Sequence, residues 1–138
     1  MDPRAAMAFM LAGRSTVTLV SLRTGARFTY GVRRVYPGVP LYSVGLLAGP
    51  DNERDYKRLA KICDGRVSLV ANSCAGEGSP SYVALRWVWE HLSRGAMPPR
   101  VEVWHEGRCG RCGRKLTVPG SIEVGIGPDC LAQMAGQP

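Results

Sequence analysis

Three cysteines and one histidine near the end of the chain constrain its fold more than any other feature. They follow the spacing His-x3-Cys-x2-Cys-x17-Cys and are His105, Cys109, Cys112 and Cys130. Two cysteines separated by two residues can wrap one metal ion through a tight turn, and the glycines at 110 and 113 permit the backbone angles of that turn. Three thiolates and one imidazole favour tetrahedral Zn²⁺. The pattern therefore predicts a structural zinc site with these four ligands.

The residues after the second cysteine fit a treble-clef-like zinc subdomain. Gly127-Pro128-Asp129 is typical of a helix start, because proline suits the first helical position. The Cys130 thiol would then face the free N–H groups of the first turn, and this position is expected to lower its pKa. We therefore expect a cysteine knuckle, a short hairpin over residues 116–122 and a helix that carries the last ligand.

Other interpretations of the cysteines remain open at this stage. Asp129 or a side chain of a partner can replace His105 as the fourth ligand, whereas His91 falls inside a predicted helix and is interpreted as structural. Cys109 and Cys112 could instead form a redox pair, but such a pair is expected beside a helix start in a βαβ unit. Three inert thiols are a further alternative.

The pattern argues against an enzyme. Zinc deaminases combine His-x-Glu with Pro-Cys-x-x-Cys, whereas here Glu106 directly follows His105 and no proline precedes Cys109. Four protein ligands would also leave no position on the metal for an activated water. No catalytic Ser/His/Asp set and no glycine-rich phosphate loop stands out. We therefore expect a protein that binds rather than catalyses.

The rest of the chain predicts an α+β fold with a small antiparallel sheet and two helices. Alternation and turn signals predict strands over residues 16–21, 27–33, 41–48, 66–70 and 101–104. The first two should form a hairpin with an arginine-bearing outer face, and residues 72–79 should form a loop. We expect one α+β domain over residues 1–99 and a zinc-binding subdomain over residues 100–138.

Two segments carry helical patterns. In the first, Asp51 or Asn52 can cap a helix that ends at Gly65, because apolar residues recur at helical spacing; they are Tyr56, Leu59, Ala60 and Cys63. In the second, Ser79-Pro80 starts a helix that ends near residues 94–95, with a buried stripe of Tyr82, Leu85, Trp89 and Leu92. Trp87 falls off this stripe, so it is either buried on a second face, which is favoured, or exposed.

The apolar stretch over residues 5–12 does not predict a membrane segment. Eight residues are too few to span a bilayer, and neither a basic leader nor a cleavage site is evident. Five cysteines are also an odd number for a disulfide framework. We therefore expect a cytoplasmic protein without a membrane partner.

The net charge of +7 is unevenly placed, since residues 3–50 hold six arginines and no acid. Such a one-sided field attracts polyanions, either nucleic acid or an acidic protein. The candidate contact residues are Arg23, Arg27, Arg33, Arg34, Arg108, Arg111, Arg114 and Lys115. Tyr30, Tyr36 or Trp87 could stack on bases. Alternatively, the arginines form an ordinary solvated surface, or those near the knuckle offset the net charge of about −1 of a zinc with three thiolates.

Residues 109–130, CGRCGRKLTVPGSIEVGIGPDC, resemble the C-terminal motif of a family of small uncharacterised proteins found largely in phages and mobile elements. In that motif Cys-x-x-Cys-Gly-Arg-x-Leu-Thr-x-Pro-x-Ser-Ile is followed by Gly-x-Gly-Pro-x-Cys. Gly120 stands where the family more often has an acid. The resemblance implies a zinc-binding domain in a phage-like protein, and it implies no reaction.

Two functions are therefore expected. The first is a zinc-containing, non-enzymatic protein that binds nucleic acid or a nucleoprotein complex. The second is a phage anti-defence inhibitor, comparable to an anti-CRISPR protein, that binds a host protein. The acid-free N-terminal region favours the first, and the phage-like motif together with the lack of a catalytic set motivates the second.

Overall fold

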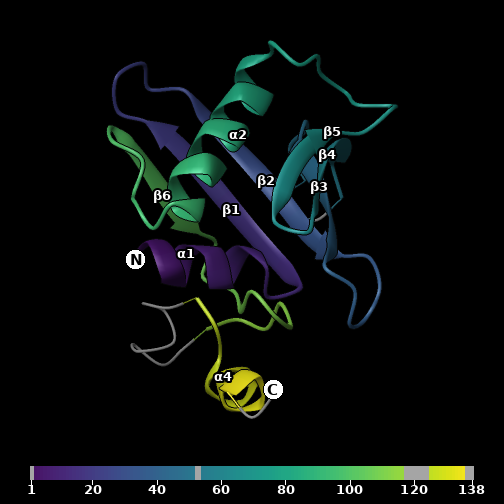
Figure 1. Cartoon of the computed structure of the whole chain (residues 1–138), viewed down its shortest axis with the longest axis vertical. Coiled ribbons are helices and arrows are strands. Elements are labelled where there is room, and N and C mark those ends of the chain that lie inside the picture. The colour runs from purple at the N-terminus through teal and green to yellow at the C-terminus, as the bar shows by residue number, and fades with distance from the viewer. Residues whose placement is uncertain (1, 52–53, 117–124, 136–138) are drawn as a thin grey trace.

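The computed structural model describes residues 2–51, 54–116 and 125–135 of the chain. The fold is α+β: five consecutive strands follow the first helix, and a sixth strand lies between the last two helices (Figure 1). The helices are α1 (Pro3–Met10), α2 (Pro80–Ser93) and α4 (Pro128–Ala135). The strands are β1 (Arg14–Ser21), β2 (Arg27–Arg34), β3 (Leu41–Leu47), β4 (Tyr56–Cys63), β5 (Arg66–Leu69) and β6 (Val101–His105).

The strands form one antiparallel sheet in the order β5-β4-β3-β2-β1-β6. The predicted α+β class and the β1–β2 hairpin are confirmed. β6, at which the predicted zinc subdomain starts, is an edge strand of this sheet because it pairs with β1, and His105 lies opposite Val17. The chain therefore leaves the sheet toward the cysteines at the end of the strands where β1 begins.

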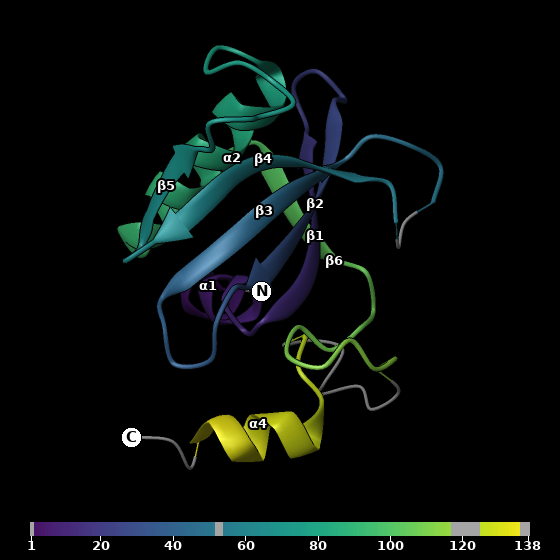
Figure 2. The same cartoon turned by 90° about the vertical axis from the view of Figure 1, so that its right-hand side faces the viewer.

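α1 and α2 cover one face of the sheet, and α4 lies apart from it beyond α1 (Figures 1 and 2). The largest side chains buried between the helices and the sheet are Tyr30, Phe9, Met10, Leu19, Leu59, Ile62, Leu85 and Leu92. The Tyr30 hydroxyl donates a hydrogen bond of 2.6 Å to the carbonyl of Ser81 on α2. Burial also raises the pKa of Tyr30, so this side chain is a neutral core residue. Its predicted role in base stacking is wrong.

The predicted helix over residues 51–65 is wrong, because this segment contains strand β4. The sheet register shifts between Val44 and Gly45 of β3, so that Leu59 is an extra residue between two partners of that strand. Leu59 and its neighbour Ala60 are consequently both buried. Two adjacent buried residues break the alternation expected of a strand and imitate the spacing of a helix.

The other predicted elements are confirmed with small differences. α2 ends at Ser93 and buries its predicted stripe. The Ser79 side chain does not cap the helix, since its hydroxyl donates to the carbonyl of Gly76 instead. Trp87 is 37% exposed, so its favoured burial is wrong. No helix within the described parts of the chain is long and apolar enough to cross a membrane.

Helix α1 was not predicted, although its start signals are present. The Asp2 side chain accepts a hydrogen bond of 2.8 Å from the backbone N–H of Ala5, and Pro3 occupies the first helical position. Ala6, Phe9 and Met10 form the buried side of the helix. α1 therefore places the Phe9 ring near the end of the sheet from which the chain continues to the cysteines.

Candidate metal centre

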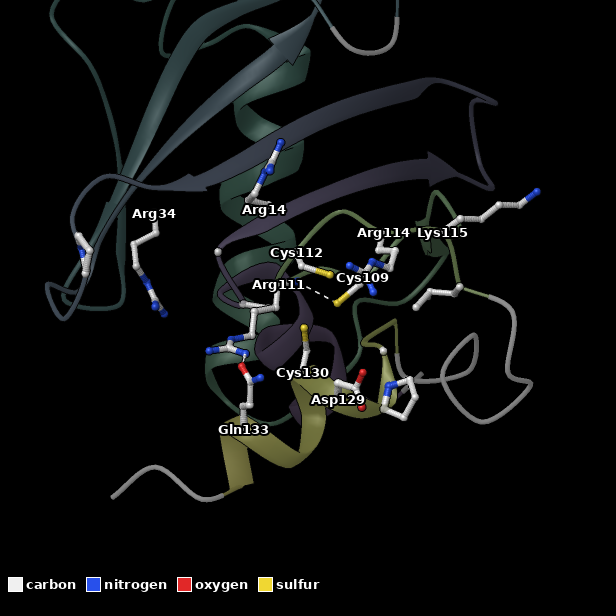
Figure 3. A pocket seen from close by; sticks show the side chains of 16 residues that line it. Arg14, Arg34, Cys109, Arg111, Cys112, Arg114, Lys115, Asp129, Cys130 and Gln133 are labelled. Carbon is white, nitrogen blue, oxygen red and sulfur yellow. Dashed lines mark hydrogen bonds between the residues drawn. The ribbon is translucent and has the colours of Figure 1, made fainter.

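Three of the four predicted ligands come together below α1. Cys109 and Cys112 lie in the loop after β6, and Cys130 lies in the first turn of α4. Their three sulfur atoms all lie within 4.8 Å of one another. Figure 3 shows the Cys130 sulfur pointing from α4 toward the other two. All five cysteines of the chain are free thiols. The three sulfurs near α4 form a cluster that can hold a metal ion.

Backbone hydrogen bonds shape the loop that carries Cys109 and Cys112. The N–H of Gly113 donates to the carbonyl of Cys109 over 2.8 Å, and the N–H of Cys109 donates to the carbonyl of Arg114 over 2.8 Å. The Arg111 N–H points at the Cys109 sulfur at 3.4 Å. Gly113 has φ of +79°, a conformation that favours glycine. The predicted knuckle is thus present, and the hairpin predicted over residues 116–122 lies largely outside the described residues.

The Phe9 ring of α1 holds this loop against the sheet. A Cβ atom added to Gly110 or to Gly125 would lie 2.6 Å from the Phe9 ring. Only glycine therefore permits the two backbone segments to approach the ring so closely. Gly110 also accepts a hydrogen bond of 2.7 Å from the N–H of Arg14 at the start of β1, and donates one of 2.8 Å to Gly125. The knuckle is consequently fixed at the junction of α1 and β1.

Few apolar side chains pack around the cysteine cluster. The buried residues around it are Ala12, Cys109, Leu116 and Ile126, with Cys130 and Met134 packed against them. One of the six belongs to the loop between α1 and β1, and two are ligand candidates. Such a small core contributes little hydrophobic free energy. A bound metal is therefore expected to supply much of the local stability.

The environments of two of the thiols differ. Burial alone would raise the pKa of Cys109. Hydrogen bonds from the backbone N–H groups of Gly127, Cys112 and Arg111 outweigh burial and lower the pKa to about 7. Burial raises the pKa of Cys130, and hydrogen bonds to the other two thiols raise it further. The expectation that the helix start lowers the pKa of Cys130 is therefore wrong, because the pKa of this thiol is raised.

His105 does not join the three sulfurs. Its ring packs against Phe9, with 5.6 Å between the ring centroids. Its Nδ1 accepts a hydrogen bond of 2.9 Å from the N–H of Gly107. Alternation along β6 places His105 on the same face as Val101 and Val103, which pack against the main core. The structure thus places this ring against Phe9 of α1 and outside the group of three sulfurs.

A basic groove of about 800 Å³ opens beside the cysteine cluster. All three clustered cysteines line it, and so does Asp129. Five basic side chains surround it and define the basic groove: Arg14, Arg34, Arg111, Arg114 and Lys115 (Figure 3). Arg111 donates a hydrogen bond to Gln133 of α4. Across the described parts of the chain, none of the five forms a salt bridge, so their charges remain available to a ligand.

The structure places the eight predicted basic contact residues in three locations. Four of the eight line the basic groove, and Arg33 and Arg108 line a neighbouring hollow. Arg23 and Arg27 lie at the opposite end of the β1–β2 hairpin, away from the cysteines. Arg14 was not among the predicted contacts, because nothing in its sequence neighbourhood indicates that its backbone joins the knuckle.

A second, apolar groove of about 780 Å³ lies between α2 and the turn of the β1–β2 hairpin. Trp87, Val83 and Phe28 line it, with Arg23 and Arg100 among the remaining lining residues. Trp87 therefore faces a groove rather than the core. Tyr36, at 62% exposed, lies in the turn after β2.

Comparison with known proteins finds a match only for the C-terminal part of the chain. Residues 102–135 match DUF6011, a family of unknown function. The match spans β6, the knuckle and α4, and it contains all three clustered cysteines. No curated protein and no solved structure shows a significant match to the chain. The family description assigns no activity.

Proposed function

We propose that this protein is a non-enzymatic nucleic-acid-binding protein in which a structural zinc ion stabilises the basic groove. The observation that carries the proposal is the composition of that groove, where five basic side chains and one acidic side chain surround three clustered cysteines. Guanidinium and ammonium groups are the usual partners of phosphate oxygens. The metal in this proposal holds the loop that presents Arg111 and Arg114.

The sulfur geometry supports zinc as the metal. Zn–S bonds of about 2.3 Å in a tetrahedron separate two sulfurs by about 3.8 Å, and the three sulfurs here lie within 4.8 Å of one another. Thiolates prefer soft or borderline metals, among which Zn²⁺ is the usual structural ion. All three cysteines line the basic groove, so a fourth ligand could reach the metal from there. Asp129 or a side chain of a partner can provide this ligand.

The positive charge of the groove lining exceeds the negative charge of a zinc ion with three thiolates. Zinc with three thiolates carries a net charge of about −1, and nearby arginines can offset that charge. The groove lining contains five basic residues and one acid, which leaves an excess of positive charge after the metal centre and Asp129 are neutralised. This excess supports binding of an anionic ligand in addition to tuning of the metal.

Binding of labelled oligonucleotides to the zinc-loaded protein tests the proposal. We expect affinity to fall steeply between about 50 mM and 200 mM salt, because each phosphate contact releases counterions. The double variant Arg111→Ala/Arg114→Ala should reduce the slope of log K against log salt by about 2. Arg4→Ala/Arg94→Ala is the matched control, since it removes the same charge from exposed positions in α1 and directly after α2. Affinity that does not change with salt, or equal effects of both variants, would contradict phosphate binding in the groove.

A second candidate function is the binding of a partner protein in the apolar groove, as in an anti-defence inhibitor of phage origin. The exposed surfaces of Trp87 and Val83, at 37% and 40%, favour this function. Because Arg23 and Arg100 accompany these apolar side chains, the fitting partner is an amphipathic segment with acidic residues.

Capture of nuclease-treated host proteins on the immobilised protein, followed by identification of the bound partner, tests this second function. Val83→Glu should abolish capture, because it places a charge in the apolar groove and repels an acidic partner. Trp104→Ala, which changes an exposed residue outside this groove, is the control. A captured protein that lacks an acidic amphipathic segment, or that still binds Val83→Glu, would argue against the apolar groove as its site.

A further inference from the structure

The face of the sheet opposite α1 and α2, called the outer face below, carries a row of mostly basic residues. The sheet register identifies its members, because cross-strand partners point to the same side. Arg14 pairs with Arg33, Arg33 pairs with Ser43, and Ser43 pairs with Lys61. In the next row Thr16 pairs with Gly31, Gly31 with Gly45, and Gly45 with Arg58. Three of the four paired positions in the first row are therefore basic.

Two hollows on the outer face connect to the basic groove through shared side chains. The first has a volume of about 540 Å³ and is lined by Arg14, Thr16, Arg33, Arg54, Glu106, Arg108 and Gly113. The second has a volume of about 290 Å³, and its lining includes Arg33, Arg54, Tyr56, Lys57 and Arg58. Arg14 belongs to both the basic groove and the first hollow, and Arg33 and Arg54 belong to both hollows. The basic side chains that line the groove and the two hollows thus form one path, called the basic path below, which runs from the cysteine cluster across the sheet.

Arg33, at the centre of this path, is held in position by the backbone. Its guanidinium donates hydrogen bonds of 2.6 Å to the carbonyl of Ser15 and 3.1 Å to its neighbour Val32. Glu106 is the one acid that lines the first hollow, and its carboxylate accepts a hydrogen bond of 3.0 Å from Thr18. As far as the structure describes the chain, no basic side chain of the path forms a salt bridge. The path therefore presents an excess of positive charge, with Arg33 fixed at its centre.

Two aromatic side chains belong to the same face. Trp104 of β6 is 52% exposed and lies opposite Thr18 of β1. The half-buried Tyr56 ring lies against Gly31, where an added Cβ would be 3.4 Å from two ring carbons, and lines the second hollow. β1 separates β6 from β2, and Trp104 lies level with Thr18 whereas Gly31 lies level with Thr16, which places Trp104 and Gly31 roughly 12 Å apart on the sheet. The basic path is thus accompanied by aromatic surface at two positions.

We propose that the outer face binds single-stranded nucleic acid, with phosphates on the arginines of the path and bases stacked on Trp104 and Tyr56. This inference rests on the proposed function, because it extends the polyanion site of the basic groove. Single strands offer unpaired bases that stack on aromatic rings, whereas the bases of a duplex are stacked on one another. A basic path with aromatic side chains beside it is the surface that proteins use to hold single strands.

The test measures the affinity of zinc-loaded full-length protein for a fluorescent oligothymidylate, for oligouridylate, and for a duplex of equal length. Trp104→Ala should weaken binding of at least one single strand roughly 5- to 150-fold, the range seen for loss of one stacked base. Arg54→Ala/Arg58→Ala should also weaken it and lower the salt slope, since both residues are exposed on the path. Arg4→Ala/Arg94→Ala should change neither. Circular dichroism and the melting temperature check that each variant is folded.

The outcomes separate this inference from the proposed function. If the duplex binds as tightly as both single strands, and Trp104→Ala has no effect while Arg111→Ala/Arg114→Ala weakens binding, the outer-face site is overturned and the basic groove stands. If none of the three oligonucleotides binds, the proposed function itself fails and the outer-face site fails with it. Preference for a single strand together with sensitivity to Trp104→Ala supports the inference.

Discussion

A strong chelator, or the substitution Cys112→Ser, is expected to unfold residues 107–116 and 125–135 while the sheet and α2 stay folded. The apolar core of this unit consists of four buried side chains, one of which is a cysteine of the cluster. Structural zinc supplies about 10–16 kcal/mol of folding free energy in zinc-finger peptides, which exceeds what so small a core provides. Hydrogen exchange measures the effect directly, at the amides of Gly110, Gly113 and Leu116, which are bonded within the unit.

The chain provides its own controls for this experiment. Cys63 lies in β4 and Cys74 in the loop before α2, and neither belongs to the sulfur cluster. Cys63→Ser and Cys74→Ser should retain one equivalent of zinc and the same amide protection as the unchanged protein. Equal protection and an unchanged melting temperature in the presence of the chelator would show that no metal stabilises the unit.

The cluster was predictable because its chemistry is largely local. The spacing of Cys109 and Cys112 fixes a knuckle, and Pro128 starts the helix that delivers Cys130. The place of His105 was not predictable by the same argument, because its distance along the chain does not say where its side chain points. The alternation of Val101, Val103 and His105 was the better signal, since it indicates the face that packs on α1.

The misassigned strand β4 shows how one irregular position changes a pattern. The extra residue Leu59 places two neighbouring side chains in the core, and this register shift depends on β3, which the sequence of β4 does not reveal. The missed helix α1 has a different cause. Its apolar stretch is short enough to resemble part of a leader or membrane segment, although Asp2 and Pro3 carry clear helix-start signals.

The basic groove depends on contacts between distant parts of the chain, and for this reason the sequence predicted it only in part. Arg111, Arg114 and Lys115 stand beside the cysteines and were predicted together. Arg14 joins them because its N–H bonds to Gly110, and Arg34 because β2 pairs with β1 next to that bond. Charge along the chain thus indicated an anionic partner, whereas the surface that meets it follows from strand pairing.

Phe9→Ala is expected to lower the free energy of unfolding by about 3–5 kcal/mol, the usual cost of removing a buried phenylalanine ring. Phe9 is 1% exposed and contacts both parts of the molecule, since it belongs to the main core and lies against Gly110 and Gly125. Its removal should therefore also weaken zinc binding, because the knuckle loses the surface that fixes it beside β1. Denaturant unfolding and a competitive zinc titration measure the two effects.

Leu85→Ala distinguishes this coupling from a general loss of stability. Leu85 of α2 is completely buried in the main core and is not part of the cluster around the cysteines. The substitution should cost about 2–5 kcal/mol and leave the zinc affinity of the folded protein unchanged. Phe9→Leu should retain most of the affinity, because a branched apolar side chain still fills the space above the two glycines. If Phe9→Ala and Leu85→Ala bind zinc equally well, the knuckle is fixed by the metal and its own hydrogen bonds, and α1 serves the main core alone.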